Sequence, residues 1–185
     1  MEQSKPFMQD LNHKHIMVYA TVKNPPTDTD LMKDWFIRLV EAVDMKVVIP
    51  PQVVNLRTPG NEGITGVVTI ETSHSSIHVW ECAPVAFLNF DLYSCKDFDP
   101  QTILKLIGEF EPYFYEVMVV DRNDNFKVIL QETVQVLKVV DLLSPEMKKN
   151  YLESKRIKNR ALLSKDHKTA QSEYNKLARF YSGRA

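Results

Sequence analysis

The sequence predicts an α+β fold: a two-layer sandwich with helices on one face of a mostly antiparallel sheet, plus a C-terminal helical extension. Three observations lead to this prediction. Short β-branched and aromatic segments alternate with turn residues, two segments show helical spacing of apolar residues, and the sign of the charge reverses near residue 143. With 185 residues, 44% of them hydrophobic, the chain is long enough for one domain with a substantial core.

The first elements are a strand and a helix. Residues 16–22 read as a strand, and the turn-forming run 24–28 ends it. Apolar residues at positions 31, 35, 39, 40 and 43 share one side of a helix, so a helix is predicted over 31–43. This spacing predicts that one face of the helix packs on the sheet.

A series of short strands follows. Segments 46–49 and 53–56 flank Pro50-Pro51, and residues 60–63 read as a turn. The further strands are rich in β-branched or aromatic residues, and they cover 67–72, 75–80 and 87–93.

The body ends with a helix and a hairpin. Asp99-Pro100 starts a helix that runs through Phe110. Residues 113–120 and 126–140 then form a hairpin around the turn 123–125. Helices segregated to one side of such a sheet define a two-layer α+β domain.

The charge distribution divides the chain into a domain over 1–143 and a basic helical extension over 144–185. The first part holds 12 Lys and Arg against 20 Asp and Glu, and the second holds 11 against 4. Two amphipathic helices are predicted in the extension, starting near Ser144 and Ser164. We favour packing of their apolar stripe on the body or on a second subunit over contact with nucleic acid, and we expect no membrane partner.

The cysteine and histidine content argues against a disulfide framework and a metal site. Cys82 and Cys95 are the two cysteines, and their spacing fits neither arrangement. His13 and His15 share one side of a strand, but no third ligand is placed to complete a metal site. No signal peptide or long apolar run is visible, so we expect a cytoplasmic protein.

The chemistry is concentrated around Ser73 and His78. Gly-x-Thr-Gly, which contains Thr65, comes before Ser-His-x-x-Ile-His-x-Trp, and a strand ending in Asp-x-x-x-Cys at Cys95 comes after it. A serine hydroxyl can attack the carbonyl before it only in a strained turn, where donors stabilise the oxyanion that forms. Thr65 and His78 are the candidate donors. A Ser-His-Asp hydrolase is an alternative, but the two residues flank a tight turn and no Gly-x-Ser-x-Gly surrounds the serine.

This ordered set of motifs resembles the S-adenosylmethionine decarboxylase proenzymes of the bacterial and archaeal type, over about residues 12–140. The resemblance implies that the chain cuts itself between Thr72 and Ser73, and that Ser73 becomes a pyruvoyl cofactor that forms a Schiff base with the substrate. It further implies that His78 serves processing with support from Thr65, and that Cys95 is the proton donor. Glu81 is the candidate substrate-binding residue.

The implied function is decarboxylation of S-adenosylmethionine for spermidine synthesis, by a homodimer whose sheets face each other. Two alternatives stay open. Pro59, where the family tends to have an aromatic, motivates a pyruvoyl-dependent arginine or ornithine decarboxylase; Thr72, where the family usually has Glu, motivates a non-cleaving homologue that acts as a binding subunit. The Asn24-Pro25-Pro26 loop and the basic tail resemble the members of this family that bacteriophages carry.

Overall fold

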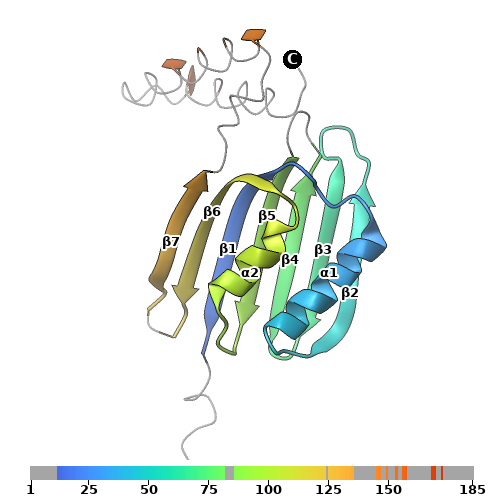
Figure 1. Ribbon diagram of the computed structural model, residues 1–185, viewed down its shortest axis with the longest axis vertical. Coiled ribbons are helices and arrows are strands. Elements are labelled where there is room, and N and C mark those ends of the chain that lie inside the picture. Colours follow the sequence, from blue (N-terminus) through green and yellow to red (C-terminus); the bar gives the residue numbers. More distant parts are fainter. Residues whose placement is uncertain are drawn as a thin grey trace, which may run out of the picture.

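A computed structural model describes residues 12–81, 86–123 and 125–135, together with isolated positions between 145 and 172. In this part of the chain, seven antiparallel strands form one sheet in the order β2-β3-β4-β5-β1-β6-β7 (Figure 1). Strand β1 therefore lies inside the sheet, between β5 and β6, and later strands are added on both sides of it. The strands are β1 (Lys14–Val22), β2 (Val47–Leu56), β3 (Gly63–Ile70), β4 (Ser73–Trp80), β5 (Ala86–Ser94), β6 (Pro112–Asp121) and β7 (Lys127–Gln135).

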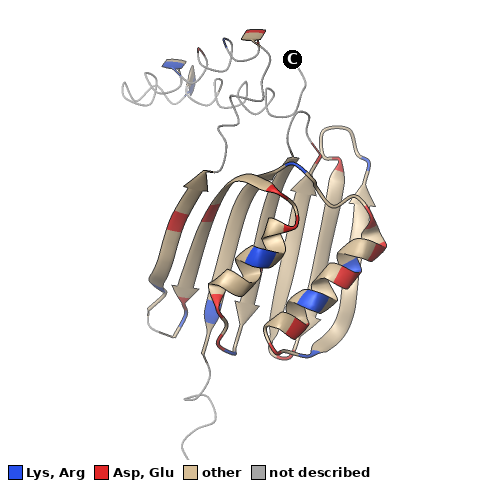
Figure 2. Ribbon diagram, in the orientation of Figure 1, with Lys and Arg blue, Asp and Glu red and all other residues tan. Residues whose placement is uncertain are grey.

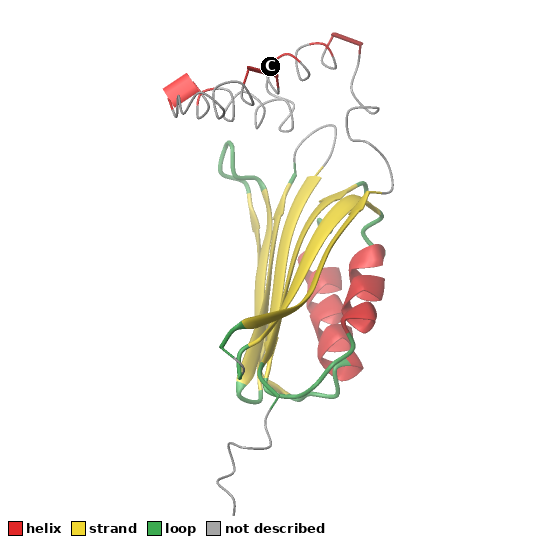
Figure 3. Cartoon of the chain, turned by 90° about the vertical axis from the view of Figure 1, so that its left-hand side faces the viewer, coloured by secondary structure: helices red, strands yellow, loops and turns green. Residues whose placement is uncertain are grey.

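Two helices connect parts of the sheet, and both lie on the same face of it (Figure 3). Helix α1 (Thr29–Ala42) follows β1, and the side chain of Asp28 accepts hydrogen bonds from the first backbone N–H groups of the helix. Helix α2 (Pro100–Gly108) follows β5, is capped by Asp99 and has proline in its first turn. The predicted two-layer α+β architecture of the body is confirmed.

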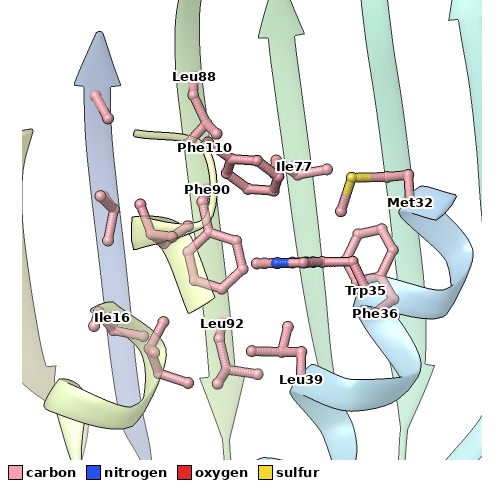
Figure 4. Packing of buried hydrophobic residues seen from close by; sticks show 14 of the residues in the cluster. Ile16, Met32, Trp35, Phe36, Leu39, Ile77, Leu88, Phe90, Leu92 and Phe110 are labelled. Carbon is pink, nitrogen blue, oxygen red and sulfur yellow. The ribbon is translucent and has the colours of Figure 1, made fainter. Parts of the chain in front are cut away.

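The core fills the space between the helices and the sheet. Trp35 of α1 is 2% exposed, and its ring contacts those of Phe36, Phe90 and Phe110 (Figure 4). Its indole N–H donates to the carbonyl of Leu106 in α2 at 3.3 Å, so its polar atom is satisfied. Along the strands, buried residues alternate with more exposed ones, and no described helix or strand covers the other face of the sheet, which we call the uncovered face.

The sequence divides one strand that the structure keeps whole. The predicted strands 46–49 and 53–56 are parts of β2, which continues through Pro50-Pro51. Strand β2 lies at an edge of the sheet, where proline is tolerated, and its pairing with β3 is irregular at this point. Strand β3 also starts earlier than predicted, at Gly63, whose φ of 141° belongs to glycine rather than to other residues.

Charged residues in the described part concentrate on the helices and near strand ends (Figure 2). The predicted helical extension over 144–185 lies largely outside the described residues, as do residues 136–140 of the predicted hairpin strand. The division into domains at residue 143 therefore stays a prediction.

Candidate functional site

The bond between Thr72 and Ser73 lies in the tight turn that joins β3 to β4. Ile70 pairs with Ser73, so Glu71 and Thr72 alone form the turn. Thr72 has a φ of 56°, in the left-handed region that β-branched residues rarely adopt. Such a conformation costs about 1–3 kcal/mol. The predicted cleavage point therefore coincides with a strained backbone position.

Cys95 follows the end of β5 and lies against this turn. Its backbone N–H donates to the Ser73 hydroxyl oxygen at 2.9 Å, and its thiol sulfur lies 2.6 Å from the Thr72 hydroxyl oxygen. The Thr72 hydroxyl donates its single proton to the carbonyl of Glu71 at 2.7 Å, so the thiol is left as the donor between Thr72 and Cys95. The structure thus brings Thr72, Ser73 and Cys95 together at the predicted cleavage point.

Thr65 and His78 also contact each other, but elsewhere. They are opposite residues of β3 and β4, with 3.3 Å between Thr65 Oγ1 and His78 Nδ1. Ser73 shares the core-facing side of β4 with Ile77, whereas His78 belongs to the opposite, uncovered face. Five residues of strand also separate His78 from Ser73 by about 17 Å. Within one copy of the chain, these two residues do not reach the Thr72–Ser73 bond.

His78 instead borders a cavity of about 450 Å³ on the uncovered face of the sheet. Residues from the five adjacent strands β4, β5, β1, β6 and β7 line it. Its polar lining includes three carboxylates, Asp91, Glu116 and Glu132, while Met17 and Met118 contribute apolar surface. The cavity can therefore receive a small ligand with both polar and apolar parts.

The carboxylate of Asp91 lies near three polar side chains on this face. Its carboxylate accepts hydrogen bonds from the Ser76 hydroxyl and from His15 Nε2, the latter at 3.3 Å. His74 Nε2 lies 3.8 Å from the same carboxylate oxygen as His15. Burial raises the pKa of Asp91, but the hydrogen bonds from His15 and Ser76 and the nearby imidazoles outweigh it, so the pKa is held below its ordinary value. Asp91 is therefore an ionised group at neutral pH.

Glu81 follows the last residue of β4, at the opposite end of this strand from Ser73. One carboxylate oxygen accepts from Arg57 at 2.9 Å. The other is buried and has no hydrogen-bond partner within the part of the chain that the structure describes. An orphan carboxylate oxygen can accept a ligand hydroxyl, which suits a substrate-binding residue, but eight residues of strand place it about 26 Å from Ser73.

The site residues predicted from the sequence did not include Asp91, Ser76 and His15. A signal for them exists, because β4 carries polar residues at every second position from His74 to His78 and β5 does the same from Asn89 to Tyr93. Polar residues at this period predict a polar face, and only the strand order shows that the two polar faces are adjacent.

The described residues contain no group of three or more His, Cys, Asp or Glu side chains with the arrangement of a metal site. Within the same ranges, no helix has the length and apolar character needed to cross a membrane.

Three comparisons with known proteins gave different results. A comparison with curated proteins gives no match. A solved structure of a phage SAM lyase in complex with S-methyl-5'-thioadenosine is similar to 73% of this chain and 95% of its own, with 8% identity and a TM-score of 0.34. The S-adenosylmethionine decarboxylase family matches residues 13–123, which is more than half of the sequence and contains the turn, Cys95 and His78. The chain therefore belongs to the S-adenosylmethionine decarboxylase family.

Proposed function

We propose that the chain is a self-processing, pyruvoyl-dependent decarboxylase that acts on S-adenosylmethionine and supplies the aminopropyl donor for spermidine synthesis. Family membership supports an enzyme that acts on S-adenosylmethionine. The observation that carries the proposal is the strained Thr72 backbone directly before Ser73, in contact with Cys95.

The turn favours the first step of processing. The Ser73 hydroxyl oxygen attacks the carbonyl carbon of Thr72, the C–N bond between the two residues breaks, and the Ser73 nitrogen takes a proton. This exchange of an amide for an ester is uphill in an ordinary peptide. Here, release of the left-handed Thr72 conformation offsets about 1–3 kcal/mol of that cost. The Cys95 N–H donates to the Ser73 oxygen and holds this group in place.

Processing then converts Ser73 into the cofactor. Loss of the Ser73 Cα proton expels the Thr72 carboxylate and leaves a dehydroalanine, which takes up water and releases ammonia. The resulting pyruvoyl group supplies an electron-withdrawing carbonyl for decarboxylation of an amine-bearing substrate. The residues of the turn fit this group, because Ser73 heads a new chain terminus beside a thiol and the residue is only 6% exposed.

Cys95 is the proposed proton donor in decarboxylation. Its thiol sulfur lies 2.6 Å from the Thr72 hydroxyl oxygen and 3.6 Å from the Glu71 carbonyl oxygen, so contacts on both residues hold it beside the bond to be cleaved. Cleavage removes the Thr72–Ser73 peptide bond that orders these partners, and the thiol proton then becomes available to the substrate carbon.

The remaining roles are proposed for the uncovered face of the sheet. His78, with support from Thr65, was predicted to assist processing, and in one copy of the chain both lie on the cavity side. Glu81 is proposed to bind substrate through its unpartnered oxygen. A homodimer with facing sheets would cover this face, which carries exposed apolar residues including Tyr19, Val54 and Val67.

A second candidate function is a non-cleaving homologue that acts by binding. The observation that favours it is the separation of Thr65 and His78 from the Thr72–Ser73 bond, which leaves the oxyanion of the first step without these two donors.

The intact mass of the denatured protein separates the two candidates. The proposed enzyme gives two fragments that meet between Thr72 and Ser73, and the larger one reacts with a ketone reagent. Ser73→Ala is expected to abolish both cleavage and activity, whereas Ser75→Ala, on the same side of β4, should still cleave. An uncleaved wild-type chain would favour the binding homologue. Release of carbon dioxide from S-adenosylmethionine, arginine and ornithine then identifies the substrate.

A further inference from the structure

Four potentially cationic side chains gather at one end of the uncovered sheet face. His15 on β1 and His74 on β4 are both opposite Tyr93 of β5. His13 immediately precedes β1, and Arg122 immediately follows β6. Elements far apart in the sequence thus bring three imidazoles and one guanidinium to the same end of the sheet.

Tyr93 holds this group together. Its hydroxyl is hydrogen bonded to His13 Nδ1, and its ring contacts the rings of all three histidines at centroid distances of 5.7–6.2 Å. The Arg122 guanidinium lies over the same ring, 4.3 Å from its centroid. The backbone N–H of Arg122 also donates to the carbonyl of His13 at 2.7 Å. The positions of these side chains are therefore set by several contacts each.

The negative charge nearby does not match this group of cations. Asp91 supplies one carboxylate, and both His15 and His74 lie near it. Lys14, from the same strand as His15, pairs with Asp97. Arg122 has no ion pair with a carboxylate among the residues that the structure describes, and it is exposed. A cation held in a fixed position without a counter-charge is able to bind an anion at low cost.

The cluster is connected to the cavity through Asp91, which lines the cavity and contacts both His15 and His74. The carboxylates of Glu116 and Glu132 lie on the β6 and β7 side of the same cavity. We propose that His13, His15, His74 and Arg122 bind the carboxylate or phosphate group of a ligand whose neutral or cationic remainder occupies the cavity.

This site strengthens on acidification. Protonation gives an imidazole a positive charge, and each such charge beside the oxyanion favours its binding. The groups that face these imidazoles are Asp91, Ser76, Tyr93 and Arg122; Asp91 is ionised at neutral pH, and the guanidinium stays charged throughout.

The test uses the full-length Ser73→Ala protein, so that its result does not depend on processing. Inorganic phosphate and acetate serve separately as probes, at about pH 6 and about pH 8, with the histidine ring C–H signals followed by NMR. We expect saturable shifts of the His13, His15 and His74 signals and binding at least about tenfold tighter at the lower pH. Tighter binding of phosphate or of acetate identifies the preferred oxyanion.

Arg122→Gln and Arg38→Gln each remove one guanidinium charge, the first inside the proposed site and the second far from it in the sequence. Arg122→Gln should weaken binding by about tenfold or more, and Arg122→Lys should weaken it less. Arg38→Gln is the matched control on α1, where Arg38 pairs with Glu109, and it should bind within about twofold of the parent. Unchanged affinity in Arg122→Gln, or histidine signals that do not move, would overturn the proposal. Thermal unfolding of each variant verifies that the comparison is between folded proteins.

Discussion

Replacement of Asp91 by Asn removes the charge that connects the polar face of the sheet. The wild-type carboxylate accepts hydrogen bonds from Ser76 and His15 and lies near His74. Hydrogen bonds to a charged acceptor contribute about 1.5–3 kcal/mol each. The side chain is 27% exposed and the amide keeps one accepting oxygen, so we take the lower end and expect Asp91→Asn to lose about 2 kcal/mol of unfolding free energy at pH 7.

The pH dependence follows from the lowered pKa of Asp91 in the folded protein. A carboxyl group with a lower pKa in the folded than in the unfolded state stabilises the fold above its unfolded pKa, about 3.9. This contribution is lost as the pH falls through the folded value. The difference between wild type and Asp91→Asn should therefore be complete above about pH 4 and shrink below it.

Urea unfolding monitored by the fluorescence of Trp35 and Trp80 measures the effect. Both the parent and the Asp91→Asn protein carry Ser73→Ala, so that neither is cleaved. Asp97→Asn is the control, because its carboxylate is 59% exposed and pairs with Lys14 at the surface. It should change the unfolding free energy by less than about 0.5 kcal/mol at pH 7. Equal stability of Asp91→Asn and its parent, or a difference that persists unchanged well below pH 4, would refute the reasoning.

Two further substitutions test the turn and the fold. Cys95→Ala should still cleave, because the backbone N–H that holds Ser73 remains, but the rate of carbon dioxide release should fall about 100-fold or more; full activity would exclude Cys95 as the acid. Gly63→Ala should lose more than about 2 kcal/mol of unfolding free energy, because its φ is 141° and a Cβ would lie 1.9 Å from the Val79 carbonyl oxygen. Gly108→Ala, with open space around it, should gain up to about 1 kcal/mol by the same assay, and similar effects at the two glycines would contradict this explanation.

The fold could be predicted because its local signals agree with each other. The helical spacing around Trp35 and the Asp99-Pro100 start both correspond to observed helices. The division of β2 at Pro50-Pro51 was wrong because proline breaks central strands but is tolerated at an edge, and a single sequence does not show which strands form the edges. The order of the strands depends on pairing between distant segments, which local patterns do not specify.

The candidate site was predictable where its residues are close in sequence or share a motif. Thr72, Ser73 and Cys95 were selected from the motif and lie together. His78 and Ser73 share the same motif, but the period of two along β4 places them on opposite faces of the sheet. The links among Asp91, His15 and His74 require three strands to be adjacent, and the sequence alone does not order them.

The two outer strands of the sheet differ in how they would respond to another chain. Pro50 and Pro51 remove two N–H donors from β2, and its pairing with β3 shifts register between Val47 and Gln52, so this edge offers a poor template for strand addition. Strand β7 contains no proline and exposes Val128 and Ile129. Aggregation of a destabilised variant through backbone pairing should therefore begin at β7, and a proline or lysine introduced there would oppose this pairing.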